Sequence, residues 1–179
     1  ETVMGRTTEY GRMRTAGRPS TVLANITGLI IVTAVEHSPL KPAMIDKFLI
    51  IAEFSGIRPL VCINKIDLVE DRLPVLDLVS ICKDIGYEVV MTSTETGEGI
   101  DALGAWIQDK TSGLVGPSGV GKSSLFNAIQ PGLSIATKRV NERKGGRHTT
   151  SATQLYPLVG GGYVADTPGI RTLQFMNMA

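Results

Sequence analysis

The sequence lacks the features that would indicate a membrane protein or a disulfide-stabilised one. Only two of its 179 residues are cysteines, Cys62 and Cys82, and both stand in apolar runs without the C-x-x-C spacing of metal ligands. We expect them to be small buried residues. No apolar run approaches the roughly 20 residues that span a bilayer, and the first residues lack the core of a signal peptide. We therefore expect a soluble intracellular protein. We also expect it to be monomeric and cytoplasmic, with the mitochondrion or chloroplast as alternative locations.

The sequence also lacks an excess of charge of one sign. Its 18 Lys and Arg residues against 17 Asp and Glu give a formal net charge of +1, so overall charge argues neither for nor against an anionic partner. Basic residues gather locally within residues 1–20 and 131–150. Both groups are compatible with contacts to nucleic-acid phosphates or with a solvated surface.

What the sequence does have is the alternation of strand and helix patterns typical of an α/β fold. Continuous apolar, β-branched runs predict strands that are buried on both faces of a parallel sheet. The strands are expected at 29–35, 59–63, 88–91, 114–115, 152–158 and 163–165, and the helices from 42, over 73–84, over 100–107 and from about 122. The predicted fold class is therefore α/β, with a mostly parallel sheet and helices on both faces.

Residues 116–123 carry the clearest motif, G-x-x-x-x-G-K-[ST], the phosphate-binding loop of P-loop NTPases. Its glycines permit a tight loop whose backbone N–H groups point at phosphate oxygens. Lys122 is expected to reach the β and γ phosphates, and the Ser123 hydroxyl to bind Mg²⁺. The remaining predicted phosphate contacts are Gly116, Ser118, Gly119, Val120, Gly121 and Ser124.

A second motif, Asn64-Lys65-Ile66-Asp67, follows a predicted strand and matches the N-K-x-D box of GTPases. A carboxylate only accepts hydrogen bonds, so Asp67 can accept from N1–H and from the 2-amino group of guanine, whereas adenine offers no such pair. Asn64 can tether neighbouring loops, and the Lys65 stem can cover the base. Alone, this tetrapeptide could be an ordinary surface turn; together with a phosphate loop it predicts binding of GTP and GDP.

A third motif, Asp166-Thr167-Pro168-Gly169, matches the D-x-x-G box. There the carboxylate of Asp166 would face Mg²⁺, and the Gly169 N–H would bond the γ phosphate. A simple Asp-Pro-Gly turn is the alternative.

The order of the three motifs is unusual, because the guanine box precedes the phosphate loop. Active-site loops in such sheets lie at the carboxyl ends of parallel strands, so a chain can be joined and reopened elsewhere without loss of the site. The sequence therefore predicts a circularly permuted GTPase domain.

The run G-P-S-G-V-G-K-S-S-L, the G-R-H-T-T at Gly146 to Thr150, D-T-P-G, and N-K-I-D placed upstream resemble the RsgA/YjeQ family of ribosome small-subunit-dependent GTPases. The resemblance implies GTP hydrolysis coupled to late maturation of the small ribosomal subunit and contact with its rRNA. It also implies that residues 1–20 are the tail of an OB-fold or a linker and that 21–179 form the GTPase domain. No Cys/His cluster of the family's C-terminal zinc-binding domain is expected.

This sequence departs from the family pattern in two loops. In the loop after the guanine box, Ser93-Thr94 stands where Ser-Ala is usual, and both residues are expected to contact the nucleotide. Residues 140–144 look inserted before Gly146, which affects the assignment of the following switch loop.

The water-positioning residue is not the glutamine of Ras-like enzymes, since Ile170 follows D-x-x-G and an aliphatic side chain cannot orient water. Either another group of the chain or a partner is expected to position the water. His148 is the internal candidate, because a neutral imidazole can accept from water; contact with RNA or solvent is the alternative. Thr149 or Thr150 is expected to bind Mg²⁺ and the γ phosphate, with Thr150 preferred. Alternative functions are a non-hydrolysing, nucleotide-gated module in a ribosomal assembly, or an ATPase or kinase.

Overall fold

A six-stranded sheet lies at the centre of the computed structural model, which describes residues 5, 7–13, 19–35, 42–131 and 154–166. Its strand order is β5-β4-β3-β6-β8-β7. The strands are β3 (Gly28–Ala34), β4 (Arg58–Asn64), β5 (Glu88–Thr92), β6 (Thr111–Val115), β7 (Gln154–Pro157) and β8 (Tyr163–Asp166). Neighbours pair in parallel except for β7 and β8, which are antiparallel. The predicted mostly parallel sheet is confirmed.

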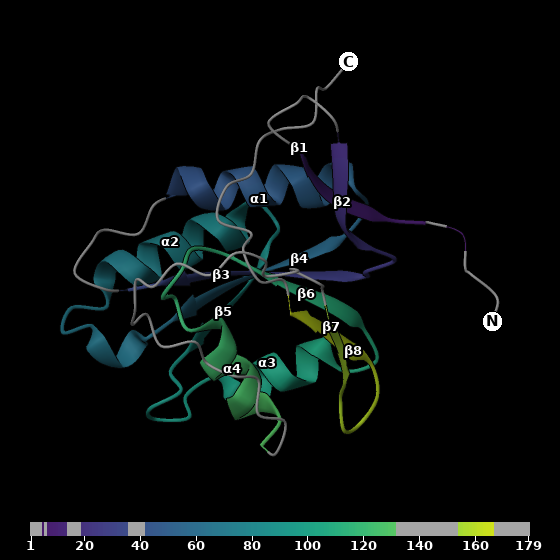
Figure 1. Ribbon diagram of the computed structural model, residues 1–179. Helices are drawn as coiled ribbons and strands as arrows, with labels where there is room; N and C mark the ends of the chain where they lie inside the picture. Colours follow the sequence, from purple (N-terminus) through teal and green to yellow (C-terminus); the bar gives the residue numbers. More distant parts are fainter. Residues whose placement is uncertain (1–4, 6, 14–18, 36–41, 132–153, 167–179) are drawn as a thin grey trace, which may run out of the picture.

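Helices cover both faces of this sheet, as predicted (Figure 1). One face carries α1 (Pro42–Phe54) and α2 (Leu73–Asp84), and the other carries α3 (Ile100–Ile107) and α4 (Lys122–Ile129). A short 3₁₀ helix, η1 (Ile66–Leu68), follows β4 and was not predicted. Within the part of the chain that the structure describes, no helix has the length and apolar character needed to cross a membrane.

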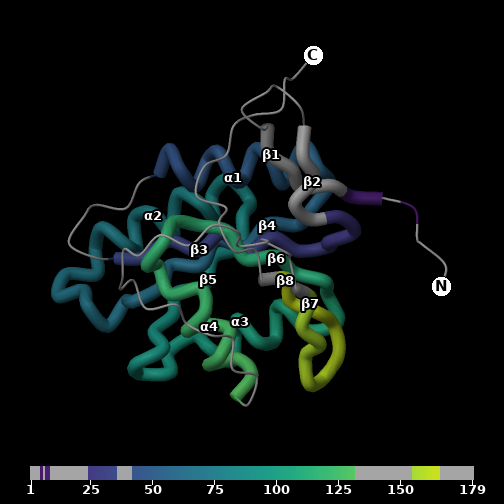
Figure 2. The backbone as a smooth tube through the Cα atoms, in the orientation of Figure 1, coloured from purple at the N-terminus to yellow at the C-terminus, as the bar shows by residue number. Residues whose placement is uncertain are grey.

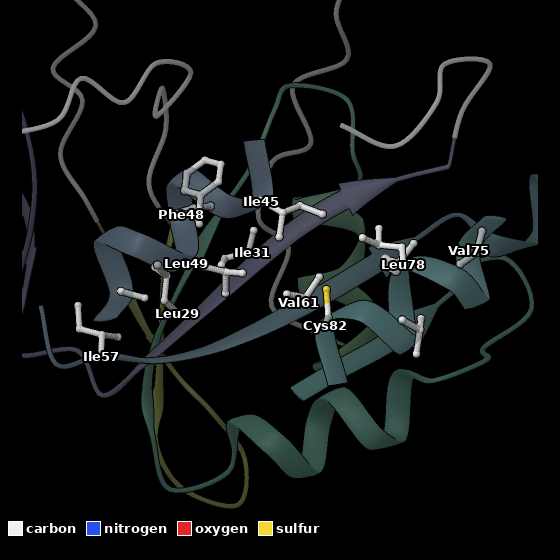
Figure 3. Packing of buried hydrophobic residues seen from close by; sticks show 14 of the residues in the cluster. Leu29, Ile31, Ile45, Phe48, Leu49, Ile57, Val61, Val75, Leu78 and Cys82 are labelled. Atoms are coloured by element: carbon white, nitrogen blue, oxygen red, sulfur yellow. The ribbon is translucent and has the colours of Figure 1, made fainter. Parts of the chain in front are cut away.

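The core consists of two apolar layers, one on each face of the sheet. Successive side chains of a strand point to opposite faces, so Leu29 and Ile31 of β3 pack beneath α1 while Ile30 and Val32 pack beneath α3 and α4. Figure 3 shows the first layer, with Phe48 of α1 among its labelled residues. The β3 run is apolar throughout because both of its faces are buried.

The helices bury the faces that their apolar spacing indicates. In α1 the buried residues are Ile45, Phe48, Leu49 and Ala52, three and four positions apart as on one side of an α-helix. Pro42 is the first residue of this helix, a position that has no intrahelical N–H bond to lose.

The two halves of the sequence contribute to one sheet. Figure 2 shows the purple and blue segments of the first half beside the green and yellow segments of the second. The junction is the parallel pairing of β3 with β6, from Gly28 opposite Ser112 to Ile31 opposite Val115. Strands that carry different motifs are thereby brought side by side.

A separate two-stranded antiparallel sheet precedes β3. It consists of β1 (Glu9–Met13) and β2 (Pro19–Ala24), neither of which was predicted. Asn25 follows β2 in a left-handed conformation (φ 57°). Its side-chain Oδ1 accepts a hydrogen bond from Thr7 N, and its backbone N–H donates to Thr8 O. The pair of strands crosses the expected domain boundary after residue 20, and the assignment of residues 1–20 to an OB-fold or linker stays a prediction.

We expect Ile31→Ala to lower the free energy of unfolding by about 2–5 kcal/mol, because Ile31 is fully buried in the central strand and its truncation leaves a cavity. Urea denaturation measures the change. Ile81→Ala on α2 is the matched control: Ile81 is 58% exposed, so its truncation should cost about 0.5 kcal/mol or less. Equal costs for the two variants would contradict this description of the core.

Candidate nucleotide-binding site

The three sequence motifs follow strands that end at the same edge of the sheet. The predicted guanine box begins at the last residue of β4, the phosphate loop follows β6, and Asp166 is the last residue of β8. Since β4, β3, β6 and β8 are consecutive parallel neighbours, their carboxyl ends lie together. Ligands of open α/β sheets bind at this edge.

The phosphate loop connects β6 to α4, and the predicted context of a strand before it and a helix after it is confirmed. Three of its glycines have backbone angles that disfavour side chains, with φ of 143° at Gly116, 87° at Gly119 and 95° at Gly121. A Cβ at Gly116 would also overlap the carbonyl oxygen of Val32. Gly121 caps α4 without offering a side chain, so the first-turn amides of the helix have no side-chain cap there and suit phosphate oxygens.

Lys122 folds back over this loop. Its Nζ donates to the carbonyl oxygens of Gly116 at 2.8 Å and Pro117 at 2.6 Å. The ammonium group is thus held at the loop by backbone acceptors. Of the other predicted phosphate contacts, Ser118, Gly119 and Ser124 are exposed, Ser123 is half-buried, and Val120 is buried in the core beneath α4.

Asn64 joins the guanine box to the phosphate loop directly. Its Nδ2 donates to the carbonyl oxygen of Val120 at 2.8 Å, and the side chain is buried at 1% exposure. A Cβ at Gly121 would overlap that same Nδ2 atom. Two segments 56 residues apart in the sequence are therefore in contact, with glycine required at the point of closest approach.

Thr92, at the end of β5, orients Asn64 and was not among the predicted site residues. Its hydroxyl donates to Asn64 Oδ1 at 3.0 Å, so the thiol of Cys62, 3.4 Å away, is left to donate to Thr92 Oγ1. No local pattern indicates this role, because Thr92 resembles any polar residue at the end of a strand. Only the pairing of β4 with β5, which sets Asn64 opposite Thr92, brings the two together.

Asp67 is exposed and contacts the loop that follows β5. Ser93 Oγ donates to Asp67 Oδ1 at 2.5 Å and accepts from the backbone N–H groups of Glu95 and Thr96 at 3.1 and 3.2 Å. Thr94 lies half-buried in the same loop. Lys65, in the left-handed conformation (φ 63°), turns the chain from β4 into η1 and so presents Asp67. The structure thus brings the guanine-box residues and Ser93 together.

Several predicted site residues lie outside the described part of the chain. These are His148, Thr149, Thr150, Gly169 and also Ile170. For Asp166 the structure gives the backbone position, at the end of β8 and one strand away from the phosphate loop. The predicted roles of all these residues stay predictions.

A phosphate loop between β6 and α4, contacted by an N-K-x-D segment that precedes it in the sequence, defines a circularly permuted P-loop GTPase fold. A family model described as RsgA GTPase matches residues 3–176, and the chain belongs to this family.

Curated relatives agree with that membership. The chain is 44% identical over 153 residues to the small ribosomal subunit biogenesis GTPase RsgA of Caldanaerobacter subterraneus subsp. tengcongensis, covering 85% of the chain and 52% of the relative. It is 43% identical over 169 residues to the protein of that name from Gemmatimonas aurantiaca, covering 93% and 55%. The chain thus spans about half the length of the curated relatives it matches.

Solved structures support the permuted fold. The crystal structure of YjeQ from Thermotoga maritima matches with a TM-score of 0.75 at 34% identity, covering 98% of this chain and 56% of that one. YloQ, described as a circularly permuted GTPase, matches with a TM-score of 0.68 at 31% identity, covering 97% and 52%.

The thiol of Cys62 should make stability fall at alkaline pH. Burial raises the pKa of this thiol from 9.0 to about 12. Between pH 9 and 12 the unfolded chain loses the thiol proton and the folded chain keeps it, so the free energy of unfolding falls by about 1.4 kcal/mol per pH unit.

Urea denaturation from pH 8 to 11 measures this effect when wild type is compared with Cys62→Ala. Other groups titrate in both proteins, so the difference between the two isolates Cys62. The stability advantage of the wild type should shrink as the pH rises above 9. A difference that does not vary with pH would contradict the raised pKa.

Proposed function

We propose that the chain binds GTP and GDP with Mg²⁺ and hydrolyses GTP to GDP and phosphate in the maturation of the small ribosomal subunit. The observation that carries the proposal is the hydrogen bond from Asn64 to Val120 O, which joins a guanine-specific box to a phosphate loop. An ATPase or kinase would not require an N-K-x-D segment in contact with its phosphate loop.

The electrostatics of the site suit a guanine nucleotide. Asp67 is exposed at one end, with its Oδ1 engaged by Ser93 and the rest of the carboxylate open to the N1–H and 2-amino donors of the base. Lys122 and the uncapped first turn of α4 supply positive charge and N–H donors for the phosphates at the other end.

The donor chemistry also fits magnesium. The proposed ligands are the hydroxyls of Ser123 and Thr150 and the carboxylate of Asp166, all hard oxygen donors. Among the described residues there is no group of three or more His, Cys, Asp or Glu side chains that could hold a metal. An ion held by few protein ligands and by nucleotide phosphates is typical of Mg²⁺, which when bound would neutralise charge on the β and γ phosphates.

The small ribosomal subunit is proposed as the partner because the curated relatives are named for its biogenesis. The cytoplasm is the proposed location for the same reason. Contact with rRNA rests on the basic residues between 131 and 150. The hydrolytic water is proposed to be oriented by His148, and Thr150 is proposed to bind Mg²⁺ and the γ phosphate.

Base specificity has a direct test in Asp67→Asn. The amide of asparagine donates where the carboxylate accepted, so it suits the 2-carbonyl of xanthine and not the 2-amino group of guanine. Each lost charge-assisted bond is worth about 1.5–3 kcal/mol. We therefore expect GDP affinity to fall about 100-fold or more and XDP affinity to rise, as measured with fluorescent nucleotides.

Asp71→Asn serves as the control for this substitution, since Asp71 is exposed and bonds only locally to Leu73 N among the contacts described. It should leave both affinities unchanged. Unaltered preference for GDP over XDP in Asp67→Asn would refute the assignment of the guanine box.

Catalysis has its own test in single-turnover GTP hydrolysis with and without small ribosomal subunits. We expect subunits to accelerate hydrolysis, and His148→Ala to slow it about 10²-fold, the lower range for a lost proton-transfer or water-orienting group. His37→Ala, at the other of the two histidines, is the control; none of the three motifs includes His37, so this variant should hydrolyse GTP at the wild-type rate. Hydrolysis that neither responds to subunits nor depends on His148 would favour the non-hydrolysing module.

A further inference from the structure

An ion pair connects the two loops that flank the predicted base-binding position. Arg72, just before α2, donates from Nη1 to Glu98 Oε1 and from Nη2 to Glu98 Oε2, both at 3.1 Å. Two parallel bonds of this kind fix the relative orientation of guanidinium and carboxylate more tightly than a single contact. Arg72 belongs to the segment after the guanine box, and Glu98 to the loop between β5 and α3.

Glu98 is coupled through its backbone to the residue that contacts Asp67. Ser93 N donates to Glu98 O at 3.0 Å, and Gly97 N donates to Ser93 O at 3.0 Å. Ser93 in turn donates its hydroxyl to Asp67 at 2.5 Å. The two loops are therefore linked at two points, Asp67 to Ser93 and Arg72 to Glu98, and the backbone closes the ring between them.

The pairing of β4 with β5 does not by itself link the loops that follow these two strands. The register of β4 with β5 ends at the pair Asn64 and Thr92, and both Asp67 and Ser93 lie beyond it. Their separation is set by loop contacts, which open more easily than strand pairs. A contact that resists such opening would keep the Asp67 carboxylate aligned with the N1–H and 2-amino donors of guanine.

We propose that Arg72 and Glu98 are a positioning pair that clamps the guanine-binding loops, slowing nucleotide release and sharpening the preference for a base with a 2-amino group. This inference rests on the proposed function, because it assigns residues to the same site. Neither side chain is a catalytic residue. The pair is solvent-exposed, at 47% and 42%, so its effect on global stability should be small, and its effect on loop opening should be what an experiment detects.

A second ion pair, between strands β4 and β5 themselves, offers a matched control. Arg58 and Glu88 join β4 to β5 at the opposite edge of the sheet, with Nε to Oε1 at 2.8 Å and Nη2 to Oε1 at 2.7 Å. Their side chains are similarly exposed, at 59% and 45%. Loss of this pair removes a comparable surface contact at the other end of the two strands, away from the predicted base-binding position.

The experiment compares Arg72→Met with Arg58→Met. Dissociation rates of fluorescent GDP and of the inosine analogue IDP, which lacks the 2-amino group, are measured by stopped flow, and melting temperatures by circular dichroism. We expect Arg72→Met to release GDP about three- to fivefold faster, the range for a well-formed exposed pair. The release of IDP should be accelerated less, because its base lacks the 2-amino group and so donates one hydrogen bond fewer to Asp67.

Three further measurements separate positioning from general destabilisation. Arg72→Lys keeps the charge without the two-bond geometry and should lie between wild type and Arg72→Met. The charge swap R72E with E98R should recover part of the slow release. High salt should reduce the difference between wild type and Arg72→Met, since the pair is exposed.

GDP release at the wild-type rate in Arg72→Met, or an equal acceleration in Arg58→Met, would overturn the proposal. Equal acceleration of GDP and IDP would also overturn it, because the clamp would then not act through Asp67. Failure of the wild type to bind GDP at all would instead overturn the proposed function, and this inference with it.

Discussion

The buried hydrogen bond from Asn64 to the carbonyl of Val120 is the constraint on which the rest of the site depends. Both ends of the Asn64 amide are used, since Nδ2 donates to the phosphate loop and Oδ1 accepts from Thr92. A buried amide that lost either partner would carry the full cost of desolvation. Gly121 is required where this contact is made, because any side chain there would meet Nδ2. The predicted guanine box and the predicted phosphate loop are therefore parts of one packed unit.

This arrangement explains why the order of the motifs can change while the site persists. In space, β3 lies between β4, which carries the guanine box, and β6, which carries the phosphate loop. Their carboxyl ends are aligned by parallel pairing, whichever strand comes first in the chain. Connections between strands affect how the sheet is wound, whereas the site depends on which strand ends are neighbours.

The sequence predicted the elements of the sheet and helices well, because each has strong local patterning. The apolar run of β3 and the spacing of Ile45, Phe48 and Ala52 in α1 are examples. The pairing of β1 with β2 was missed, since glycine and arginine in 1–20 mask any strand pattern. The role of Thr92 was missed because it depends on the β4–β5 pairing. Glu98 was missed as the partner of Arg72 because their contact joins two loops beyond that pairing, and many exposed charges look alike in sequence.

The buried polar side chains near the site are neutral, and the charged Asp67 is exposed. The described buried polar side chains at the carboxyl ends of β3, β4 and β5 are the neutral Thr33, Asn64, Thr92 and Ser93. Neutral groups can be buried when they hydrogen-bond one another, whereas a buried charge is far more costly. Asp67, which is proposed to select guanine by its charge, is exposed and accepts a hydrogen bond from one of these side chains, Ser93. Ser93 can thus orient the Asp67 carboxylate while that carboxylate stays exposed to water.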